Sequence, residues 1–155
     1  AARMVLLSEF GPEGFSFYTN YESRKAKEMI TAPYAALVFY WEELHQQVRI
    51  EGRVEKAPAS QSDSYFATRP RESQLGAWAS PQSEEISSRQ ELVERMHELA
   101  EQYTDSDIPR PPHWGGYRVL PDRFEFWASR PGRLHDRFCY ELGTDSAWTI
   151  TRLAP

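Results

Sequence analysis

Three short groups of residues in this sequence combine cations and hydroxyl groups at spacings that suit anion binding. The first is Ser23-Arg24-Lys25 at the start of a predicted short helix, for which Ser23 is a good N-cap and which Pro33 ends. A helix N-terminus carries unpaired N–H groups and partial positive charge, so two cations in the first turn are locally unfavourable. The N–H groups and both cations would all interact favourably with a bound phosphate. The alternative is a solvent-exposed helix start.

The second group is Tyr65, Arg69 and Ser73, which recur every four residues. On a continuous helix these side chains share one face, and Pro70 is tolerated in the first turn of a following helix. Two hydroxyls and a guanidinium that converge suit a phosphate ester. The alternative is a solvated polar helix face.

The third group is Arg133-Leu134-His135-Asp136-Arg137, predicted to begin a strand. Strand alternation places Arg133, His135 and Arg137 on one face, with Asp136 on the other. A row of like charges is unfavourable unless an anion or an electron-rich ring lies against it. The alternative is an exposed face of a sheet.

Other reactive residues give weaker signals. The four histidines, at positions 45, 97, 113 and 135, lack metal-ligand spacing, so no metal site is predicted. The sequence has no Gly-rich dinucleotide motif and no P-loop. Cys139 lies in a predicted strand and is expected to be a buried small apolar residue. Trp114-Gly115-Gly116 is predicted to be a tight turn with an aromatic plug.

Apolar periodicity and turn residues predict the elements that position these groups. Residues Gln46 to Ala57 alternate apolar and charged side chains, which is typical of a half-buried antiparallel strand. Ser88 and Glu91 form a capping box for a helix over Arg89 to Tyr103. The other predicted helices cover 23–31, 60–68 and 71–79, with strands over 3–7, 15–19, 34–41, 117–120 continuing into 123–128, 133–142 and 147–153.

Length and composition limit the class of protein. The chain has 155 residues, 40% apolar residues and a net charge of -5, which favours a single folded domain over 1–155 and disfavours nucleic acid as a partner. Its longest unbroken apolar stretch has 8 residues, Tyr34 to Trp41, too short for a transmembrane helix. One cysteine permits no internal disulfide and favours a cytoplasmic location. Antiparallel strands with inserted helices predict a mainly β (α+β) fold or a β-barrel.

The ordered motifs together resemble the pyridoxine (pyridoxamine) 5'-phosphate oxidase family over Arg3 to Pro155. The residues that carry the resemblance are Arg3-Met4-Val5-Leu6-Leu7, Phe17-Tyr18-Thr19-Asn20, Ser23-Arg24-Lys25, Arg69 to Trp78, Ser80-Pro81-Gln82-Ser83, Trp114-Gly115-Gly116-Tyr117, Glu125-Phe126-Trp127, Arg133 to Arg137 and Arg152-Leu153-Ala154-Pro155.

The resemblance implies an FMN-binding split β-barrel with Greek-key strands and peripheral helices. It further implies a homodimer with FMN at the interface, acting on pyridoxine or pyridoxamine 5'-phosphate with dioxygen. Arg133 and His135 would be catalytic, and with Leu134 they would lie over the substrate ring. The substrate phosphate would be bound by Ser8, Tyr65, Arg69 and Ser73. FMN would be bound by Arg3, Met4, Val5, Leu6, Leu7, Tyr18, Thr19, Arg24, Lys25, Gln47, Gln82, Ser83, Trp127 and Arg137.

Two departures from the family pattern leave alternatives open. The family has Lys directly after the Met-Val-Leu-Leu strand, where it helps to bind substrate phosphate, whereas this chain has Ser8. The family's N-terminal segment, which covers the substrate, is expected to be absent. The alternatives are a non-catalytic FMN- or pyridoxal-phosphate-binding protein, and a flavin oxidoreductase that acts on another anionic ring.

Overall fold

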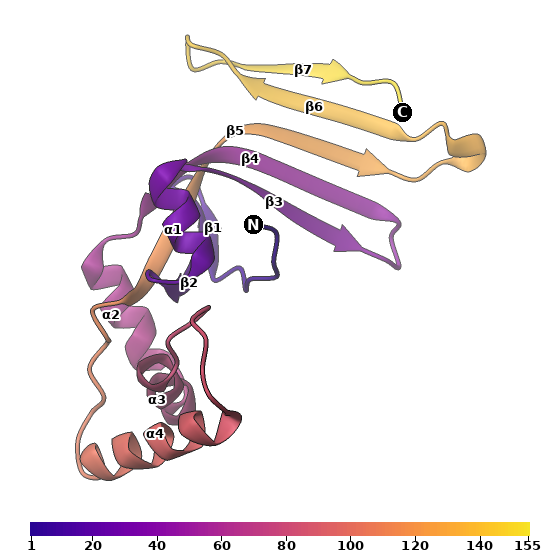
Figure 1. Ribbon diagram of the computed structural model, residues 1–155. Coiled ribbons are helices and arrows are strands. Elements are labelled where there is room, and N and C mark those ends of the chain that lie inside the picture. The colour runs from indigo at the N-terminus through magenta and orange to yellow at the C-terminus, as the bar shows by residue number, and fades with distance from the viewer.

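The computed structural model describes residues 1–155 as an antiparallel sheet with four α-helices (Figure 1). The sheet has seven strands in the order β1-β2-β5-β4-β3, with β6 added to β5 and β7 added to β6. The strands are β1 Glu9–Gly11, β2 Gly14–Asn20, β3 Tyr34–Trp41, β4 Gln46–Lys56, β5 Trp114–Ala128, β6 Asp136–Leu142 and β7 Trp148–Arg152. The helices are α1 Arg24–Thr31, α2 Ala59–Thr68, α3 Arg71–Ala79, α4 Arg89–Gln102 and the short 3-10 helix η1 Pro131–Arg133.

The long strand β5 divides the sheet into two parts. Its first half pairs with β2 and its second half with β6, while β4 runs along nearly its whole length. The register between β4 and β5 shifts at Glu51 and Gly52, opposite Pro121. A Cβ on Gly52 would lie 2.0 Å from the Leu120 carbonyl oxygen, so only glycine permits this close approach.

The three helices α2, α3 and α4 form an arm that extends from one end of the sheet (Figure 1). Pro70 separates α2 from α3 and stands at the N-cap of α3, where its missing N–H removes no helical hydrogen bond. The predicted cap of α4 is present, because Ser88 Oγ accepts a hydrogen bond from the Glu91 N–H. None of the helices is long and apolar enough to cross a membrane.

The chain has two small apolar cores and leaves much apolar surface exposed. One core lies between the sheet and α1 around Phe17 and Val119, and the other lies within the helical arm around Phe66 and Trp114. Only 25 of the 155 residues are buried. Exposed apolar side chains include Met4, Leu6, Val38, Tyr40, Leu134 and Ile150. Exposed apolar surface on this scale is typical of a protein–protein interface.

Two predicted strands are wrong. Residues 3–7 pair with no strand, and the hairpin over Gly11-Pro12-Glu13-Gly14 joins β2 to the shorter strand β1 instead. The strand predicted from Arg133 begins at Asp136, because Gly132 and Arg133 have φ values of 67° and 63° and belong to the turn η1. Left-handed backbone breaks the two-residue alternation that the prediction assumed.

Candidate functional site

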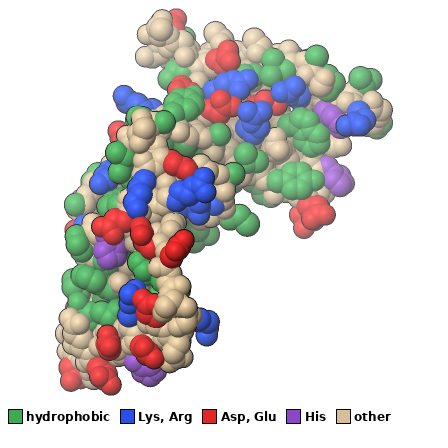
Figure 2. Space-filling view, in the orientation of Figure 1, with side chains coloured by type: hydrophobic (Ala, Val, Ile, Leu, Met, Phe, Trp, Pro, Cys, Tyr) green, Lys and Arg blue, Asp and Glu red, His purple; other side chains and the backbone are tan.

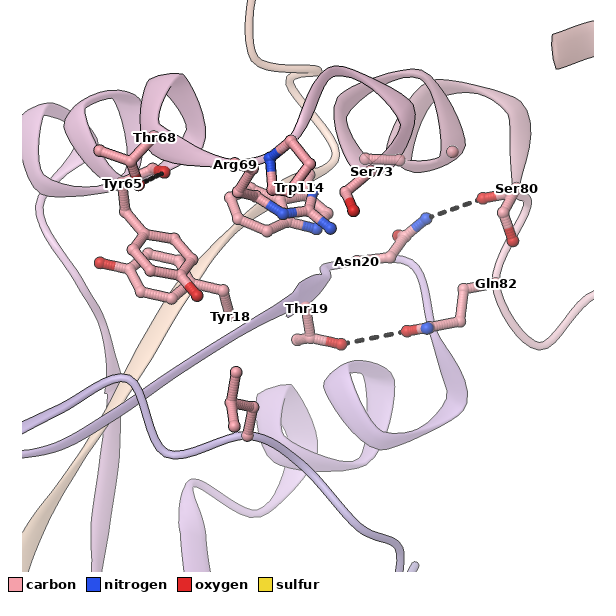
Figure 3. Close-up of a pocket in the computed structure, with 14 residues that line it drawn as sticks. Tyr18, Thr19, Asn20, Tyr65, Thr68, Arg69, Ser73, Ser80, Gln82 and Trp114 are labelled. Atoms are coloured by element: carbon pink, nitrogen blue, oxygen red, sulfur yellow. Dashed lines mark hydrogen bonds between the residues drawn. The ribbon is translucent and has the colours of Figure 1, made fainter.

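A cavity of about 610 Å³ lies where β2 meets α2 and α3 (Figure 3). Tyr65, Arg69 and Ser73 all line it, so the spacing of four residues does bring them together across Pro70. The rest of the lining includes Tyr18 and Thr19 of β2, together with Leu6, Gln82 and Trp114. Lys25 of the first predicted anion-binding group lies next to this cavity, because its Nζ atom donates hydrogen bonds to the lining residues Thr19 and Gln82.

Arg69 supplies positive charge to this cavity without a carboxylate partner. Its Nη1 atom is buried and has no hydrogen-bond partner. Its Cζ atom lies 4.6 Å from the centre of the Trp114 ring, and burial lowers the pKa of the guanidinium. A half-buried cation with unused N–H donors fits an anionic group that enters the cavity.

Lys25 is a second cation without a carboxylate, and it is buried. Its Nζ atom donates hydrogen bonds to Thr19 Oγ1, to Ser23 Oγ at 3.0 Å and to Gln82 Oε1 at 2.8 Å. Burial, and then the positive charge of Arg3, lower the pKa of Lys25 to about 8. All three hydrogen-bond partners are neutral, so the ammonium charge is uncompensated.

The N-terminus of α1 is open to an anion. Ser23 is completely buried at the N-cap, makes no side-chain capping bond, and no acidic residue lies in the first turn. Arg24 and Ser83 line the neighbouring open pocket, and Arg24 forms an ion pair with Glu28 at 3.0 Å. The sequence-predicted conflict of charges at this helix start is therefore present in the structure.

The opening segment lies between this cavity and an apolar groove. Arg3, Met4, Val5 and Leu7 line the groove against residues 36–39 of β3, whereas Leu6 lines the cavity. Ser8 is half-buried, and its N–H donates to the Ser16 carbonyl oxygen at 2.9 Å. Ser8 is absent from the cavity lining, in contrast to the other three predicted phosphate-binding residues.

The remaining predicted residues form a second cluster, on β4, β5 and β6. Gln47 pairs with Trp127, and Trp127 pairs with Arg137, so the three side chains form one row across the strands. The ring centre of His135 lies 4.7 Å from that of Trp127. Arg133 and Leu134 are exposed in the turn that follows β5.

This second cluster lies far from the cavity. The turn between β5 and β6 stands at the opposite end of the molecule from α2 and α3 (Figure 1). Within one chain, Arg69 therefore lies far from the predicted catalytic residues Arg133 and His135. It also lies far from the other members of the second cluster, Gln47, Trp127, Leu134 and Arg137. As predicted, Asp136 does not pair with these cations; it binds Arg130 at 2.6 Å and Arg152 at 3.0 Å.

Two residues of these clusters were missed by the sequence analysis. Trp114 was interpreted as a plug in a turn, yet it begins β5 and lines the cavity. Glu125 is 3% exposed and accepts hydrogen bonds from Arg137 at 2.8 Å and from Arg49 at 3.3 Å. A carboxylate between Phe124 and Phe126 in an aromatic strand is the available signal for such a buried ion pair. Charged side chains of both signs gather over this part of the sheet (Figure 2).

Replacing Glu125 by Gln should lower the free energy of unfolding at pH 7 by about 2 kcal/mol, because Arg137 loses a charged partner in a buried setting. The Arg137 guanidinium holds the pKa of Glu125 below its ordinary value of 4.5. The stabilisation is therefore complete above pH 4.5 and is lost as the pH falls through the lower folded-state value. Urea unfolding across this pH range measures it.

The difference in the free energy of unfolding between wild type and Glu125→Gln should thus become smaller as the pH falls. Glu51→Gln is the matched control, because Glu51 pairs with Arg49 and Arg123 on the same face but is more exposed. Its effect should be smaller at every pH. A gap for Glu125→Gln that stays constant below pH 4.5 would contradict the assignment.

Comparisons with known proteins place the chain among characterised families. Residues 2–103 match the family model described as pyridoxamine 5'-phosphate oxidase, and residues 114–155 match the pyridoxine 5'-phosphate oxidase C-terminal dimerisation region. A Gloeothece citriformis protein named pyridoxine/pyridoxamine 5'-phosphate oxidase is 55% identical over 155 residues, which are 100% of this chain and 72% of that protein. The protein of the same name from Microcystis aeruginosa is 57% identical over 154 residues, 99% of this chain and 72% of that protein.

Solved structures confirm the predicted fold class, a split barrel with peripheral helices. PhzG from Burkholderia lata, in complex with tetrahydrophenazine-1-carboxylic acid, superposes with a TM-score of 0.93 and 33% identity, covering 100% of this chain and 75% of PhzG. An FMN-binding protein from Nostoc punctiforme, related to pyridoxamine 5'-phosphate oxidase, gives a TM-score of 0.76 at 16% identity, covering 100% of this chain and 80% of that one.

Proposed function

Since the chain belongs to the pyridoxamine 5'-phosphate oxidase family, we propose that it oxidises pyridoxine or pyridoxamine 5'-phosphate to pyridoxal 5'-phosphate. The proposed cofactor is FMN, and dioxygen is the electron acceptor that yields hydrogen peroxide. The observation that carries the proposal is the uncompensated guanidinium of Arg69 in a cavity that it shares with the hydroxyl-bearing Tyr65 and Ser73. Such a site suits the phosphate of the substrate.

The residues around Lys25 fit the phosphate of FMN. A buried ammonium with only neutral partners, the uncapped start of α1 and the nearby charge of Arg3 all favour a dianion. The residues proposed to hold FMN are those that the sequence predicts, namely Arg3, Met4, Val5, Leu6, Leu7, Tyr18, Thr19, Arg24, Lys25, Gln47, Gln82, Ser83, Trp127 and Arg137.

The complete site requires a second copy of the chain in this proposal. Arg69 and Arg133 lie at opposite ends of one chain, although both would contact the same small substrate. The dimerisation region at 114–155 and the exposed apolar side chains support a homodimer. Each site would combine the cavity of one chain with the Arg133 turn of its partner, with FMN between them.

The chain's own residues would bind and align the substrate. Arg69 would bind the phosphate in a bidentate manner, and Tyr65 and Ser73 would donate further hydrogen bonds. FMN held by these residues would supply a hydride acceptor for the substrate C4' carbon, with dioxygen as the final electron acceptor. Arg133 would stabilise negative charge at the reacting oxygen or nitrogen, because its guanidinium is exposed and forms no ion pair.

His135 would orient the substrate from its Nε2 atom. Its Nδ1 atom accepts a hydrogen bond from the Arg130 N–H at 3.2 Å, which places the proton of the neutral ring on Nε2. This nitrogen is then a donor to the substrate, so His135 serves alignment more than proton abstraction.

A second candidate is oxidation of a different anionic ring. It is favoured by the likeness to PhzG, whose structure holds tetrahydrophenazine-1-carboxylic acid. A carboxylate on a tricyclic ring and a phosphate on a pyridine could both bind Arg69, but the phosphate carries more negative charge to pair with the guanidinium.

Steady-state hydrogen peroxide production by the purified protein tests the proposal. A visible flavin absorption spectrum and turnover with pyridoxine 5'-phosphate are expected, with much weaker turnover of unphosphorylated pyridoxine. Flavin without turnover would identify a binding protein, and turnover only with tetrahydrophenazine-1-carboxylic acid would favour the second candidate.

Replacing Ser8 by Lys should strengthen binding of pyridoxine 5'-phosphate about tenfold. A lysine would add a charge-assisted hydrogen bond to the phosphate, typically worth about 1.5–3 kcal/mol. Binding of unphosphorylated pyridoxine should change little, and paired titrations of both ligands measure the difference. An equal change for both ligands, or none, would show that position 8 does not face the substrate phosphate.

A further inference from the structure

Arg69 is held in the cavity wall by aromatic rings. Its Cζ atom lies 4.6 Å from the ring centre of Trp114 and 5.7 Å from that of Phe66. It takes part in none of the ion pairs of the chain. An arginine with a buried Nη1 atom is ordinarily paired with a carboxylate, so this arrangement needs a physical reason.

Trp114 is held among several other rings. It is 7% exposed and stacks on Tyr18, with ring centres 5.4 Å apart and planes 10° apart. Tyr65 lies parallel to the same indole within 1°, and Phe66 contacts it edge-on at 5.2 Å. Figure 3 shows the Arg69 guanidinium close to the indole of Trp114 and directed toward Ser73.

The backbone of Trp114 is fixed as well. Its N–H donates to the Pro111 carbonyl oxygen at 3.0 Å, and its own carbonyl accepts from Arg110 Nη1 at 2.5 Å. Gly115 follows, and a Cβ there would lie 2.1 Å from the Tyr21 hydroxyl. A side chain at 115 would displace Tyr21, so the backbone after Trp114 packs closely against its neighbours.

We propose that Trp114 is a positioning residue for the substrate phosphate, which it serves by holding the Arg69 guanidinium through a cation–π contact. This inference rests on the proposed function. All five N–H donors of a guanidinium lie in its plane, so a ring against its face uses none of them. A carboxylate partner would occupy those donors and repel a dianion, whereas the indole leaves both charge and donors available.

The proposal predicts an effect on phosphate binding and none on the reaction step. Cation–π contacts are modest in strength, so loss of the indole should weaken the anion site about tenfold. Trp114→Leu holoenzyme should show that increase in the KM for pyridoxine 5'-phosphate and in the dissociation constant for inorganic phosphate. Its kcat should stay within about twofold of wild type, because the reacting carbon is remote from Arg69.

Trp78→Leu is the matched control. Trp78 belongs to the same apolar core, but its ring contacts His113 and its Nε1 donates to the Pro109 carbonyl oxygen at 2.8 Å. Loss of Trp78 should leave the dissociation constant for phosphate unchanged. Equal weakening by both substitutions would show that Trp114 acts only through core packing and would overturn the proposal.

Trp114→Phe provides a second variant with a smaller aromatic face. Phosphate binding should weaken about threefold, between wild type and Trp114→Leu, since the indole is the better cation–π partner. If Trp114→Leu does not fold, this variant decides alone, and unchanged phosphate affinity overturns the proposal. Failure of the proposed function is separate: the wild type would then bind inorganic phosphate but give no peroxide with pyridoxine 5'-phosphate.

Discussion

Replacing Arg24 and Lys25 together by Gln should weaken FMN binding at least about a hundredfold, because each lost charge-assisted contact is worth about 1.5–3 kcal/mol. Riboflavin lacks the phosphate, so its affinity should stay within about threefold of wild type. The difference arises at the start of α1, where Lys25 is buried against neutral partners and no acidic residue lies in the first turn. Fluorescence titration of the apoprotein with each flavin measures both dissociation constants.

The same measurement has a pH dependence with a defined sign. Burial lowers the pKa of Lys25 to about 8, so the free ammonium loses its proton as the pH rises through that value. FMN affinity should therefore decline above pH 8 in the wild type, and the decline should be absent when Lys25 is Gln.

Lys56→Gln is the control for a general loss of positive charge, because Lys56 lies over the Tyr21 ring away from the cavity residues. It should leave both flavins bound as in wild type. Equal weakening of FMN and riboflavin binding by the Arg24 and Lys25 substitutions would show that the FMN phosphate does not bind at this helix start.

Replacing Arg133 by Leu should lower kcat about a hundredfold to a thousandfold while FMN stays bound, as expected for a group that stabilises developing charge. Arg133 is free for this role, since it is exposed in a turn with φ 63° and pairs with no carboxylate. His135→Asn should have a smaller effect, about tenfold, because alignment is only one part of the rate. Steady-state kinetics and the flavin absorption of each variant separate turnover from cofactor loss.

The matched control for Arg133→Leu is Arg130→Leu in the same turn. Arg130 forms an ion pair with Asp136 at 2.6 Å, so its charge is already compensated. Its loss should alter kcat by less than about threefold. Unchanged kinetics in Arg133→Leu would exclude this residue from catalysis.

Local sequence patterns predicted the helices and strands that are determined by neighbouring residues. The alternation over 46–57 gives β4, the Pro70 break gives α2 and α3, and Ser88 caps α4. The Tyr65, Arg69 and Ser73 group follows from helical periodicity alone, and the structure brings all three to one cavity. The pattern of strands and helices also predicted the α+β class, whereas the split barrel and most of the FMN-binding residues came from the family resemblance.

Long-range packing explains what the sequence did not predict. Residues 3–7 have strand-like composition but pair with no strand, and they line an apolar groove beside the edge strand β3 instead. Trp114 contacts Arg69, which is distant in sequence. Glu125 binds Arg137 of the neighbouring strand, a contact that depends on how the two strands pair. The spacing of Arg69 and Arg133 contains no information on whether they meet within one chain or between two.

Hybrid dimers provide the most direct test that one site is built from two chains. Arg69→Gln and Arg133→Leu chains, each nearly inactive alone, should regain activity when co-expressed, because half of the sites in a mixed dimer carry neither substitution. Random pairing should restore about a quarter of wild-type peroxide production from pyridoxine 5'-phosphate at subsaturating concentration, as symmetric dimers require. Activity that stays at the level of the two parents would place Arg69 and Arg133 in the same chain's site and contradict the account.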